Sequence, residues 1–567
     1  EGLLEYEPRL AAETMVQVKY KGDRYVIPRR ELRDEYQVLA EIPEGSFYLA
    51  PGTGRKTTGS YYTQETLVSF LVERTLEPLV KGKTAEEILQ LKVLDPAMGS
   101  GHFLVGACRY LATAYARALA AEGLPASPSV QPPSMPADLA RDIAEVLKGT
   151  GVPLAQDVAA AVSDQRADDI DEEAKGASPE SPPEIAATPE HMRLVAERCL
   201  YGVDLNPMAV ELAKVSLWLA TMAGDRPLTF LDHHLKCGNS LIGARLADID
   251  NLPLGKKGRG LRSDEGGQVR LFTDSDLRTS LDRVVDLRRI LGTWQTETVQ
   301  DAIDKARLLR DLDHEAPGWN ELREVCDLWC AAWFWPDDEE FRAATPMDAV
   351  IYRSVADVIR EPGYLFAPTN AAAYRDAAHK IAERQHFFHW ELEFPEVYFD
   401  DHDHRLENSG FDAVVGNPPW DTVQVNSKEF FSTYDPRFRE VSKQEATVRA
   451  QELLRGPDVA ARWLAYDIFL ERQDLFFRQS GQFPHQAAVV DGKRVGADSN
   501  TYKLFLERFR QLTAAHGHAG IIVPSGLYTD EGCTGLRQLF FEHSGVDYLY
   551  GFENRNKIFP IDSRFKF

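Results

Sequence analysis

Four consecutive residues, Asn417, Pro418, Pro419 and Trp420, follow an apolar run over residues 411–415. Consecutive prolines hold the backbone extended and leave carbonyl groups without local partners. The Asn417 side-chain oxygen and the Pro418 carbonyl could then accept hydrogen bonds from both N–H groups of a conjugated amine. The Trp420 ring could stack on the same group. The tetrapeptide therefore indicates a site for a planar amine, and the alternative is an ordinary turn.

A second polar cluster follows a short apolar run at residues 92–94. From Asp95 the sequence reads Asp-Pro-Ala-Met-Gly-Ser-Gly-His-Phe, so an acidic residue ends a strand, a glycine-rich turn follows and an amphipathic helix begins. Backbone N–H groups then meet at the carboxyl edge of the sheet, where a nucleoside cofactor could bind. The spacing is not G-x-G-x-x-G and no Gly-Lys-Ser/Thr follows, which argues against dinucleotide and nucleoside-triphosphate sites. A turn without a ligand is the alternative.

Residues 201–207 repeat the order of strand, acidic residue, turn and helix, with Asp204 as the acidic residue. A carboxylate at the end of a second strand is well placed to bind both hydroxyls of a ribose. Taken alone, however, an Asp in this position is more often a helix cap. The sequence leaves both readings of Asp204 open.

The elements that must position these residues alternate between short apolar runs and amphipathic helices. The strand-like runs are residues 92–94, 199–203, 411–415 and 520–524. Strands that alternate with helices predict an α/β fold with a mostly parallel sheet covered on both faces.

Two stretches depart from this pattern. Residues 121–190 contain ten prolines and 14 acidic against 4 basic residues, which predicts an acidic, partly disordered insertion. Residues 247–386 begin with a glycine-rich polar segment and continue with helical periodicity at 277–291, 299–312 and 319–335, which predicts a helical insertion. Cys326 and Cys330 lie four residues apart on one of these helices without a second ligand pair, so we expect core packing rather than a metal.

Composition and charge restrict the class of protein. With 567 residues, 44% hydrophobic and 27% charged, the chain predicts a globular protein of several structural units. No apolar run reaches the roughly 18 residues of a membrane span, and six scattered cysteines favour a reducing compartment, so we expect a cytoplasmic protein. The net charge of −24 is unusual for a protein that grips phosphates over a broad face, so any nucleic-acid site must be local or shared with a partner.

Together the motifs resemble the gamma class of DNA adenine-N6 methyltransferases, and more narrowly the Eco57I-type restriction-modification methylases, which include the PglX methylases of BREX and the methylases of DISARM phage-defence systems. The matching segments follow the order of the family and are residues 58–63, 95–103, 204, 238–241, 389–396, 417–420, 552–555 and 558–562.

The resemblance implies a Rossmann-like class I fold and S-adenosylmethionine (SAM) as the cofactor. It also implies that Asn417, Pro418, Pro419 and Trp420 are catalytic, and that Phe559 covers the second face of the substrate base, although Phe559 could also be a core residue. Asn239 stands where Asp is common in the family, so it would offer an amide to the adenine of the cofactor. The residues implied in cofactor binding are Tyr62, Thr63, Asp95, Pro96, Ala97, Gly99, Gly101, Phe103, Asp204 and Asn239.

The implied reaction is methylation of the N6 atom of an adenine flipped out of double-stranded DNA. A sulfonium methyl group is already a good electrophile, so we expect no metal and no covalent nucleophile. Other subunits of a defence complex are further candidate partners, and no membrane contact is expected. The resemblance implies the following division of the chain: 1–50, the end of a preceding helical region; 51–120, 191–246 and 387–567, the methyltransferase core; 121–190 and 247–386, the insertions; and a target-recognition domain beyond residue 567.

Three alternatives remain at this point. The same fold and tetrapeptide could methylate RNA or a protein glutamine. A degenerate methylase could act as a catalytically silent DNA-binding subunit of a defence complex, although the intact motif residues argue against this. A methylase could also be fused to an endonuclease, but the sequence contains no convincing nuclease constellation.

Overall fold

The computed structural model covers the whole chain and describes most of it. The described residues are 6–10, 14–20, 23–32, 36–51, 63–124, 186–222, 226–250, 284–285, 287–315, 318–335, 347–361, 370–400, 405–406, 408–435, 437–438, 441–486, 488–490, 493–495, 499–556, 558–559 and 563–567. Most of the predicted acidic insertion and much of the predicted helix at 277–291 lie outside these residues.

A five-stranded sheet lies at the centre of the fold, with the strand order β12-β9-β6-β7-β8. All neighbouring strands run parallel, which confirms the predicted α/β class with a parallel sheet. The apolar run predicted at 520–524 overlaps only the end of its strand, which begins earlier. The strands are β6 Val93–Asp95, β7 Leu200–Asp204, β8 Leu235–Cys237, β9 Phe411–Gly416 and β12 Thr513–Ile521.

Alternate residues of the central strands face two different hydrophobic cores. Val93, Ala413 and Val415 point into one core, whereas Leu94 and Val414 point into the other. Successive side chains of a strand lie on opposite faces of the sheet, so both faces here are apolar and buried. Parallel strands buried in this way end at one common edge, which brings the residues after β6, β7 and β9 together.

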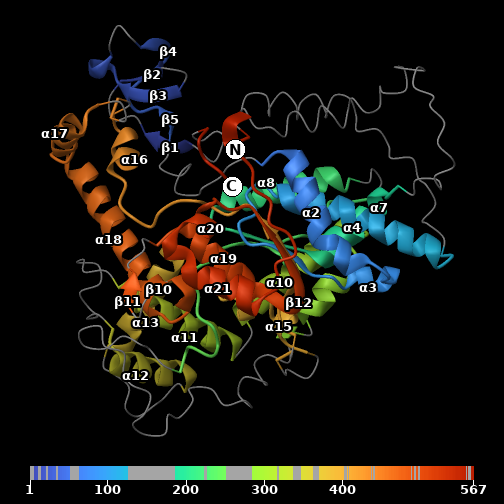
Figure 1. Ribbon diagram of the computed structural model, residues 1–567. Coiled ribbons are helices and arrows are strands. Elements are labelled where there is room, and N and C mark those ends of the chain that lie inside the picture. The colour runs from blue at the N-terminus through green and yellow to red at the C-terminus, as the bar shows by residue number, and fades with distance from the viewer. Residues whose placement is uncertain are drawn as a thin grey trace, which may run out of the picture.

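One face of the sheet is covered by helices from the N-terminal part of the chain, whose buried side chains form a hydrophobic core with the strands (Figure 1). Helix α2 packs against α4 and β12, and α4 packs against α7 and α8. The other face is covered by α19 (Thr501–Leu512) and by the insertion. The helices of the first face are α2 Glu65–Val80, α3 Ala85–Leu89, α4 His102–Ala121, α7 Pro189–Cys199 and α8 Pro207–Ala220.

Helices are found where the helical insertion is predicted, within residues 247–386. Cys326 and Cys330 are fully buried on α11 beside Trp329 and Trp333, and burial raises the pKa of both thiols well above the ordinary value. The core-packing interpretation of this cysteine pair is therefore confirmed. The helices are α10 Val299–Glu315, α11 Trp319–Ala331, α12 Ala349–Arg360 and α13 Ala371–Gln385.

The expectation that residues 1–50 end a helical region was wrong, because the described part of this segment forms antiparallel strands. Val16 and Val18 are fully buried on one face of β2, and this two-residue period is the sequence signal of a strand. The strands are β1 Tyr6–Leu10, β2 Met15–Tyr20, β3 Asp23–Pro28, β4 Gln37–Ile42 and β5 Phe47–Pro51.

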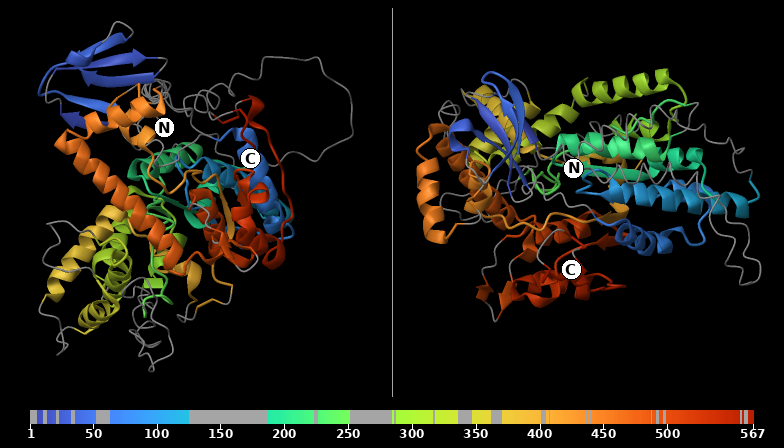
Figure 2. Two further views of the ribbon diagram at one scale, coloured as in Figure 1. Left: turned by 60° about the vertical axis from the view of Figure 1, so that its left-hand side comes forward. Right: turned by 90° about the horizontal axis from the view of Figure 1, so that it is seen from above.

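After the Asn417–Trp420 tetrapeptide the chain leaves the core and forms three helices, α16 Ser427–Ser432, α17 Lys443–Leu453 and α18 Pro457–Gln479, which we call the arm. An aromatic cluster that includes Phe431 and Trp463, stacked with ring centroids 4.7 Å apart, holds these helices together. The arm lies at one side of the molecule, next to the N-terminal strands in each view (Figure 2).

From the end of α18 the chain returns to the core through the hairpin of β10 and β11, and then enters α19. Short helices flank β9 and follow β12. The remaining elements are β10 Ala488–Val490, β11 Lys493–Val495, α14 Trp390–Glu393, α15 Pro395–Tyr398, α20 Gly526–Thr529 and α21 Thr534–His543.

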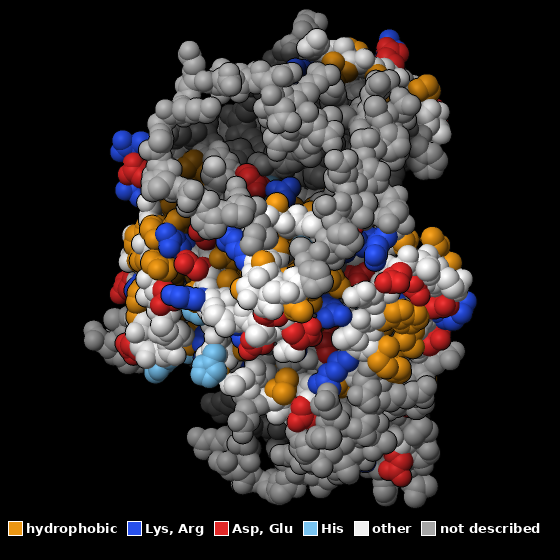
Figure 3. All heavy atoms as spheres, turned by 90° about the vertical axis from the view of Figure 1, so that its right-hand side faces the viewer, with side chains coloured by type: hydrophobic (Ala, Val, Ile, Leu, Met, Phe, Trp, Pro, Cys, Tyr) orange, Lys and Arg blue, Asp and Glu red, His pale blue; other side chains and the backbone are white. Residues whose placement is uncertain are grey.

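The surface of the described residues is mixed in charge. On the face shown in Figure 3, acidic and basic side chains are interspersed and form no broad basic surface among the coloured residues. Within the described part of the chain, no helix combines the length and the apolar character that a membrane crossing requires. The coloured residues of the face in Figure 3 therefore do not form a broad phosphate-binding surface.

Close packing at Gly243 gives a test of this arrangement. A Cβ atom at Gly243 would lie 1.9 Å from the Phe388 carbonyl oxygen, so Gly243→Ala must displace backbone and should lower the free energy of unfolding by about 1–3 kcal/mol. The matched control is Gly545→Ala, because no heavy atom lies within 4 Å of its added Cβ. Urea unfolding of both variants measures the difference. Equal stability of the two variants would contradict the packing described at Gly243.

Candidate active site

The loop after β6 is built from a buried carboxyl group and two glycines. Asp95 is 1% exposed, and its Oδ1 atom accepts a hydrogen bond of 3.0 Å from the Ala97 N–H. Gly99 and Gly101 have φ values of 53° and 83°, a left-handed region that favours glycine. A Cβ at Gly101 would also lie 3.1 Å from the Cβ of Ala213 on α8. The loop therefore turns tightly into α4 and packs against α8.

Asp204 connects this loop to the end of β7. Its Oδ2 atom accepts from the Gly99 N–H at 2.9 Å, and its Oδ1 atom accepts from the Asn206 N–H at 2.8 Å. The cap of α8 is Asn206, whose Oδ1 atom accepts from the Met208 N–H at 2.9 Å. Asp204 is therefore not the cap of α8, so the helix-cap interpretation of this residue is excluded.

Burial sets the electrostatics of this edge of the sheet. Burial raises the pKa of Asp95 to about 8 and that of Asp204 to about 6, and the charge of Asp204 contributes to the shift of Asp95. Two partly desolvated carboxyl groups favour a ligand that donates hydrogen bonds to them, such as one with hydroxyl or ammonium groups. The pair of carboxyl groups suits the ribose and amino groups of a nucleoside cofactor.

The turn that follows β8 lies against the same loop. The Gly238 N–H donates to the Asp204 carbonyl at 2.9 Å, and the Ser240 hydroxyl donates to the Pro96 carbonyl at 2.5 Å. The Oδ1 atom of Asn239 accepts from the Leu241 N–H at 3.1 Å and so closes the turn. The Asn239 oxygen is thus used within the turn, and its amide nitrogen is the group left for a ligand.

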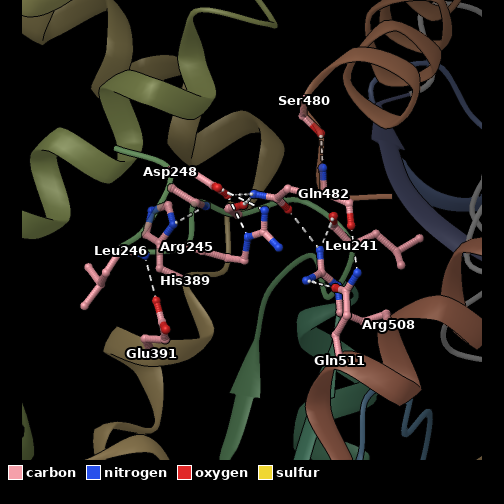
Figure 4. A network of polar contacts seen from close by, with 12 residues as sticks. Leu241, Arg245, Leu246, Asp248, His389, Glu391, Ser480, Gln482, Arg508 and Gln511 are labelled. Carbon is pink, nitrogen blue, oxygen red and sulfur yellow. Dashed lines mark hydrogen bonds and ion pairs between the residues drawn. The ribbon is translucent and has the colours of Figure 1, made fainter. Parts of the chain in front are cut away.

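A buried polar network holds this turn from behind (Figure 4). The Arg508 guanidinium on α19 donates to the Leu241 carbonyl at 3.1 Å and to the Gln482 Oε1 atom at 3.2 Å. Gln482 follows α18 and donates through Nε2 to the Gly243 carbonyl at 2.8 Å and to Asp248 at 3.0 Å. The end of the arm and α19 therefore fix the turn that bears Asn239.

The segment at residues 389–396 has a structural role. His389 accepts the Ala244 N–H on Nδ1 at 3.0 Å, so its ring carries the proton on Nε2, which contacts Asp327 on α11 at 3.0 Å. Glu393 forms an ion pair with Lys236 on β8 at 2.6 Å. Lys236 and Arg323 hold the pKa of the Glu393 carboxyl far below its ordinary value. The segment fastens the helical insertion to the sheet.

The Asn417–Trp420 tetrapeptide begins directly after β9 and lies close to Asp95. A Cβ at Gly416 would lie 2.8 Å from the Asp95 Oδ1 atom, so the backbone approaches that carboxyl closely. Asn417 donates through Nδ2 to the Thr63 hydroxyl at 3.1 Å. Its Oδ1 atom is buried and has no hydrogen-bond partner among the described residues. A buried acceptor without a partner is costly, so Oδ1 has the capacity to accept a hydrogen bond from a ligand.

The rest of the tetrapeptide is packed from several sides. Pro418 is buried, and the Pro419 carbonyl accepts from the Thr501 hydroxyl at 2.7 Å. Trp420 is half-buried and contacts Phe559 edge to face, with ring centroids 5.4 Å apart and planes at 72°. Phe559 is 1% exposed. In this conformation Phe559 supports the flank of Trp420 and is not stacked parallel to it.

The structure brings most of the predicted site residues to one edge of the sheet. The hydrogen bonds and close approaches described above connect the loop from Asp95 to Gly101 with Asp204, Asn239, Thr63 and Asn417. Phe103 lies in the core beneath the loop at 4% exposure, and Tyr62 lies outside the described residues.

Sequence reasoning missed the side chains that support the site from a distance, namely Thr501, Gln482 and Arg508. Each of them contacts a motif that is far away in sequence, so no local spacing marks it. A local sequence signal near Thr501 is Asn500, which caps the start of α19. Its Oδ1 atom accepts from the Tyr502 N–H at 3.2 Å.

Comparisons with known proteins show which proteins this chain resembles. Residues 198–450 match the Eco57I restriction-modification methylase family. A protein of Methanocaldococcus jannaschii named as a type II restriction enzyme and methyltransferase, RM.MjaORFECS2P, is 21% identical in an alignment of 456 residues that covers 71% of this chain and 31% of that protein. The adenine-specific methyltransferase PglX of Streptomyces coelicolor is 39% identical over 82 residues, which are 14% of this chain and 6% of PglX.

These matches give the class of protein that the chain resembles: its described core is a parallel α/β fold, and residues 198–450 are similar to Eco57I restriction-modification methylases. The resemblance inferred from the motifs to this family and to PglX is confirmed. The chain spans less than a third of the length of the curated relatives that it matches.

The raised pKa of Asp204 predicts a pH effect on stability. A carboxyl group that holds its proton more tightly in the folded chain stabilises the fold below its unfolded pKa, and this stabilisation is lost as the pH rises through the folded value of about 6. Between pH 5.5 and 7.5 the wild type should lose about 1 kcal/mol of unfolding free energy relative to Asp204→Asn, which does not titrate. Urea unfolding at both pH values measures this loss. A difference that stays constant with pH would contradict the buried state of Asp204.

Proposed function

We propose that this chain is the methyltransferase part of a SAM-dependent DNA methyltransferase of Rossmann-like class I fold, which flips adenine out of duplex DNA and methylates N6. The observation that carries the proposal is the buried, unpartnered Oδ1 atom of Asn417 beside Trp420. An acceptor and a flat aromatic face suit a planar base that bears an amino group. The names of the two relatives, a type II restriction enzyme and methyltransferase and an adenine-specific methyltransferase, support the same substrate.

The residues at the carboxyl edge fit SAM by the chemistry of their donors and acceptors. The carboxyl group of Asp204 suits the ribose hydroxyls, because burial disfavours its charge unless donors approach it. The loop over Asp95, Pro96, Ala97, Gly99 and Gly101 suits the remainder of the cofactor. Asn239 offers its Nδ2 group to the adenine, and Thr63 and Tyr62 are proposed to complete the site. When bound, SAM supplies an electrophilic methyl group.

The residues of this chain would then position and activate the amine. The Thr63 hydroxyl oxygen accepts a hydrogen bond from the Nδ2 group of Asn417. The Oδ1 atom of Asn417 then serves as the acceptor for one N–H of the adenine amino group. The Pro418 carbonyl accepts the second N–H. Two acceptors draw the nitrogen lone pair out of conjugation with the ring and direct it toward the methyl group. Trp420 stacks on the base and offsets part of the cost of unstacking it from the duplex.

The second-face role of Phe559 stays a prediction. In the described conformation its ring packs against the flank of Trp420, and Asn554 fixes its backbone through hydrogen bonds of 2.9 and 3.0 Å. Stacking on a flipped base would need Phe559 to leave this position. The supported role is therefore to brace Trp420.

Double-stranded DNA is the proposed partner, within a restriction-modification or phage-defence system, with other subunits of such a system as further candidates. Because the chain carries a net negative charge, we propose that other parts of the protein or a partner make many of the contacts to DNA phosphates. Cytoplasmic localisation and the absence of a metal requirement belong to the same proposal. RNA, protein glutamine and a silent DNA-binding role are the competing functions, and the two relatives named as methyltransferases favour DNA and active chemistry.

The direct test of the site is Asn417→Ala. Removing the acceptor should lower methyl transfer to unmethylated DNA by at least about 100-fold, because this contact acts on the reacting nitrogen, whereas SAM affinity should change by less than about threefold. Transfer from methyl-labelled SAM and calorimetric SAM binding provide the two readouts.

The matched control is Asn408→Ala, at an exposed asparagine away from the site, which should leave both quantities unchanged. Retained turnover in Asn417→Ala would rule out the proposed role of the tetrapeptide. Loss of SAM binding in the same variant would place Asn417 in the cofactor site instead.

A further inference from the structure

The orientation of Trp420 depends on its backbone as well as on the packing of its ring. The indole Nε1 atom is buried and has no hydrogen-bond partner among the described residues. Its ring contacts Phe559 and Phe567 with centroids 5.4 and 6.1 Å away, and these are non-directional apolar contacts. A platform for a planar base must hold its plane, so another part of the chain has to fix the backbone of Trp420.

One hydroxyl group contacts the backbone on both sides of Trp420. The Thr501 Oγ1 atom donates to the Pro419 carbonyl at 2.7 Å and accepts from the Asp421 N–H at 2.8 Å. A threonine hydroxyl has one proton to donate and lone pairs to accept, so both bonds can form together. The Thr501 N–H also donates to the Asp421 carbonyl at 2.8 Å. Thr501 therefore fixes the peptide groups before and after Trp420.

The same contacts close the base of the arm. Between Asp421 and Thr501 the chain passes through α16, α17 and α18 and returns, and Thr501 is 80 residues from Asp421. At the base of this excursion, the Val423 N–H donates to the Ser499 carbonyl at 2.8 Å, and Thr422 pairs with Asn500 in an antiparallel bridge. The platform residue and the two ends of the arm thus share one small hydrogen-bonded unit.

We propose that Thr501 is a positioning residue that sets the plane of Trp420 and so controls how well the active site receives a flipped base. This inference rests on the proposed function of the tetrapeptide. Thr501 acts through the backbone of its neighbours, and the hydroxyl is the group that matters. A small displacement of a platform is enough to lose a large part of the rate, since alignment supplies most of the catalysis at such a site.

The test replaces Thr501 by Val, which keeps the shape but removes the hydroxyl, and by Ser, which keeps the hydroxyl. We expect Thr501→Val to lower kcat for methyl transfer to unmethylated genomic DNA by about 10- to 100-fold, with the KM for SAM within about twofold of wild type. Thr501→Ser should restore kcat to within about threefold of wild type. The matched control is Thr513→Val at the start of β12, directly after α19, where the hydroxyl donates to the Phe509 carbonyl of α19.

A second readout does not depend on activity. The Asp421 amide should exchange its hydrogen with deuterium faster in the full-length Thr501→Val protein than in wild type, because it loses its acceptor, and the Ser variant should exchange like wild type. Unchanged kcat and unchanged exchange in Thr501→Val would overturn the inference. Equal losses in Val and Ser variants would also overturn it, because the hydroxyl would then not be the determinant.

The two proposals can fail separately. If the wild type transfers no methyl group to DNA, the proposed function fails, and the exchange of the Asp421 amide still reports whether the Thr501 hydrogen bonds form. If the wild type is active and the Val variant matches it in kcat, the positioning role of Thr501 fails while the proposed function stands.

Discussion

The hydrogen bond from the Gly99 N–H to the Asp204 carboxylate joins the two loops on which the site is built. It forms at the common edge of β6 and β7, where parallel strands end together, and it requires Gly99 in a left-handed conformation. Asp95 and Asp204 are held there with raised pKa values because burial disfavours their charge. The same edge receives Asn417 from β9, with its amide oxygen left without a partner among the described residues.

Supporting groups surround this edge from parts of the chain that are distant in sequence. Thr63 orients the Asn417 amide across 354 residues, and Arg508 and Gln482 fix the turn that bears Asn239. His389 and Glu393 fasten the helical insertion to the back of the sheet. Of the two insertions, the helical one contributes its described helices α11 and α13 to the larger hydrophobic core, whereas most of residues 121–190 lies outside the described part.

Local patterns in the sequence were enough to predict the central strands and the residues at their ends. The run before Asp95 and the run before Asn417 are each apolar, short and followed by a turn, so strand, edge and polar residue could be inferred together. Thr501 and Arg508 could not be inferred, because their partners depend on how the arm returns to the core. The N-terminal strands could not be predicted with the same ease, because the two-residue period at Val16 and Val18 spans only one short strand.

The account stands on the claim that the buried acceptor of Asn417 receives the amino group of adenine in DNA. The most direct test offers the full-length protein methyl-labelled SAM with unmethylated duplex DNA, RNA and cell-extract protein in parallel, followed by digestion of the labelled DNA to nucleosides. The account predicts label in N6-methyladenine and background levels in RNA and protein. Label in RNA or in protein glutamine, or SAM binding without transfer to any substrate, would contradict it.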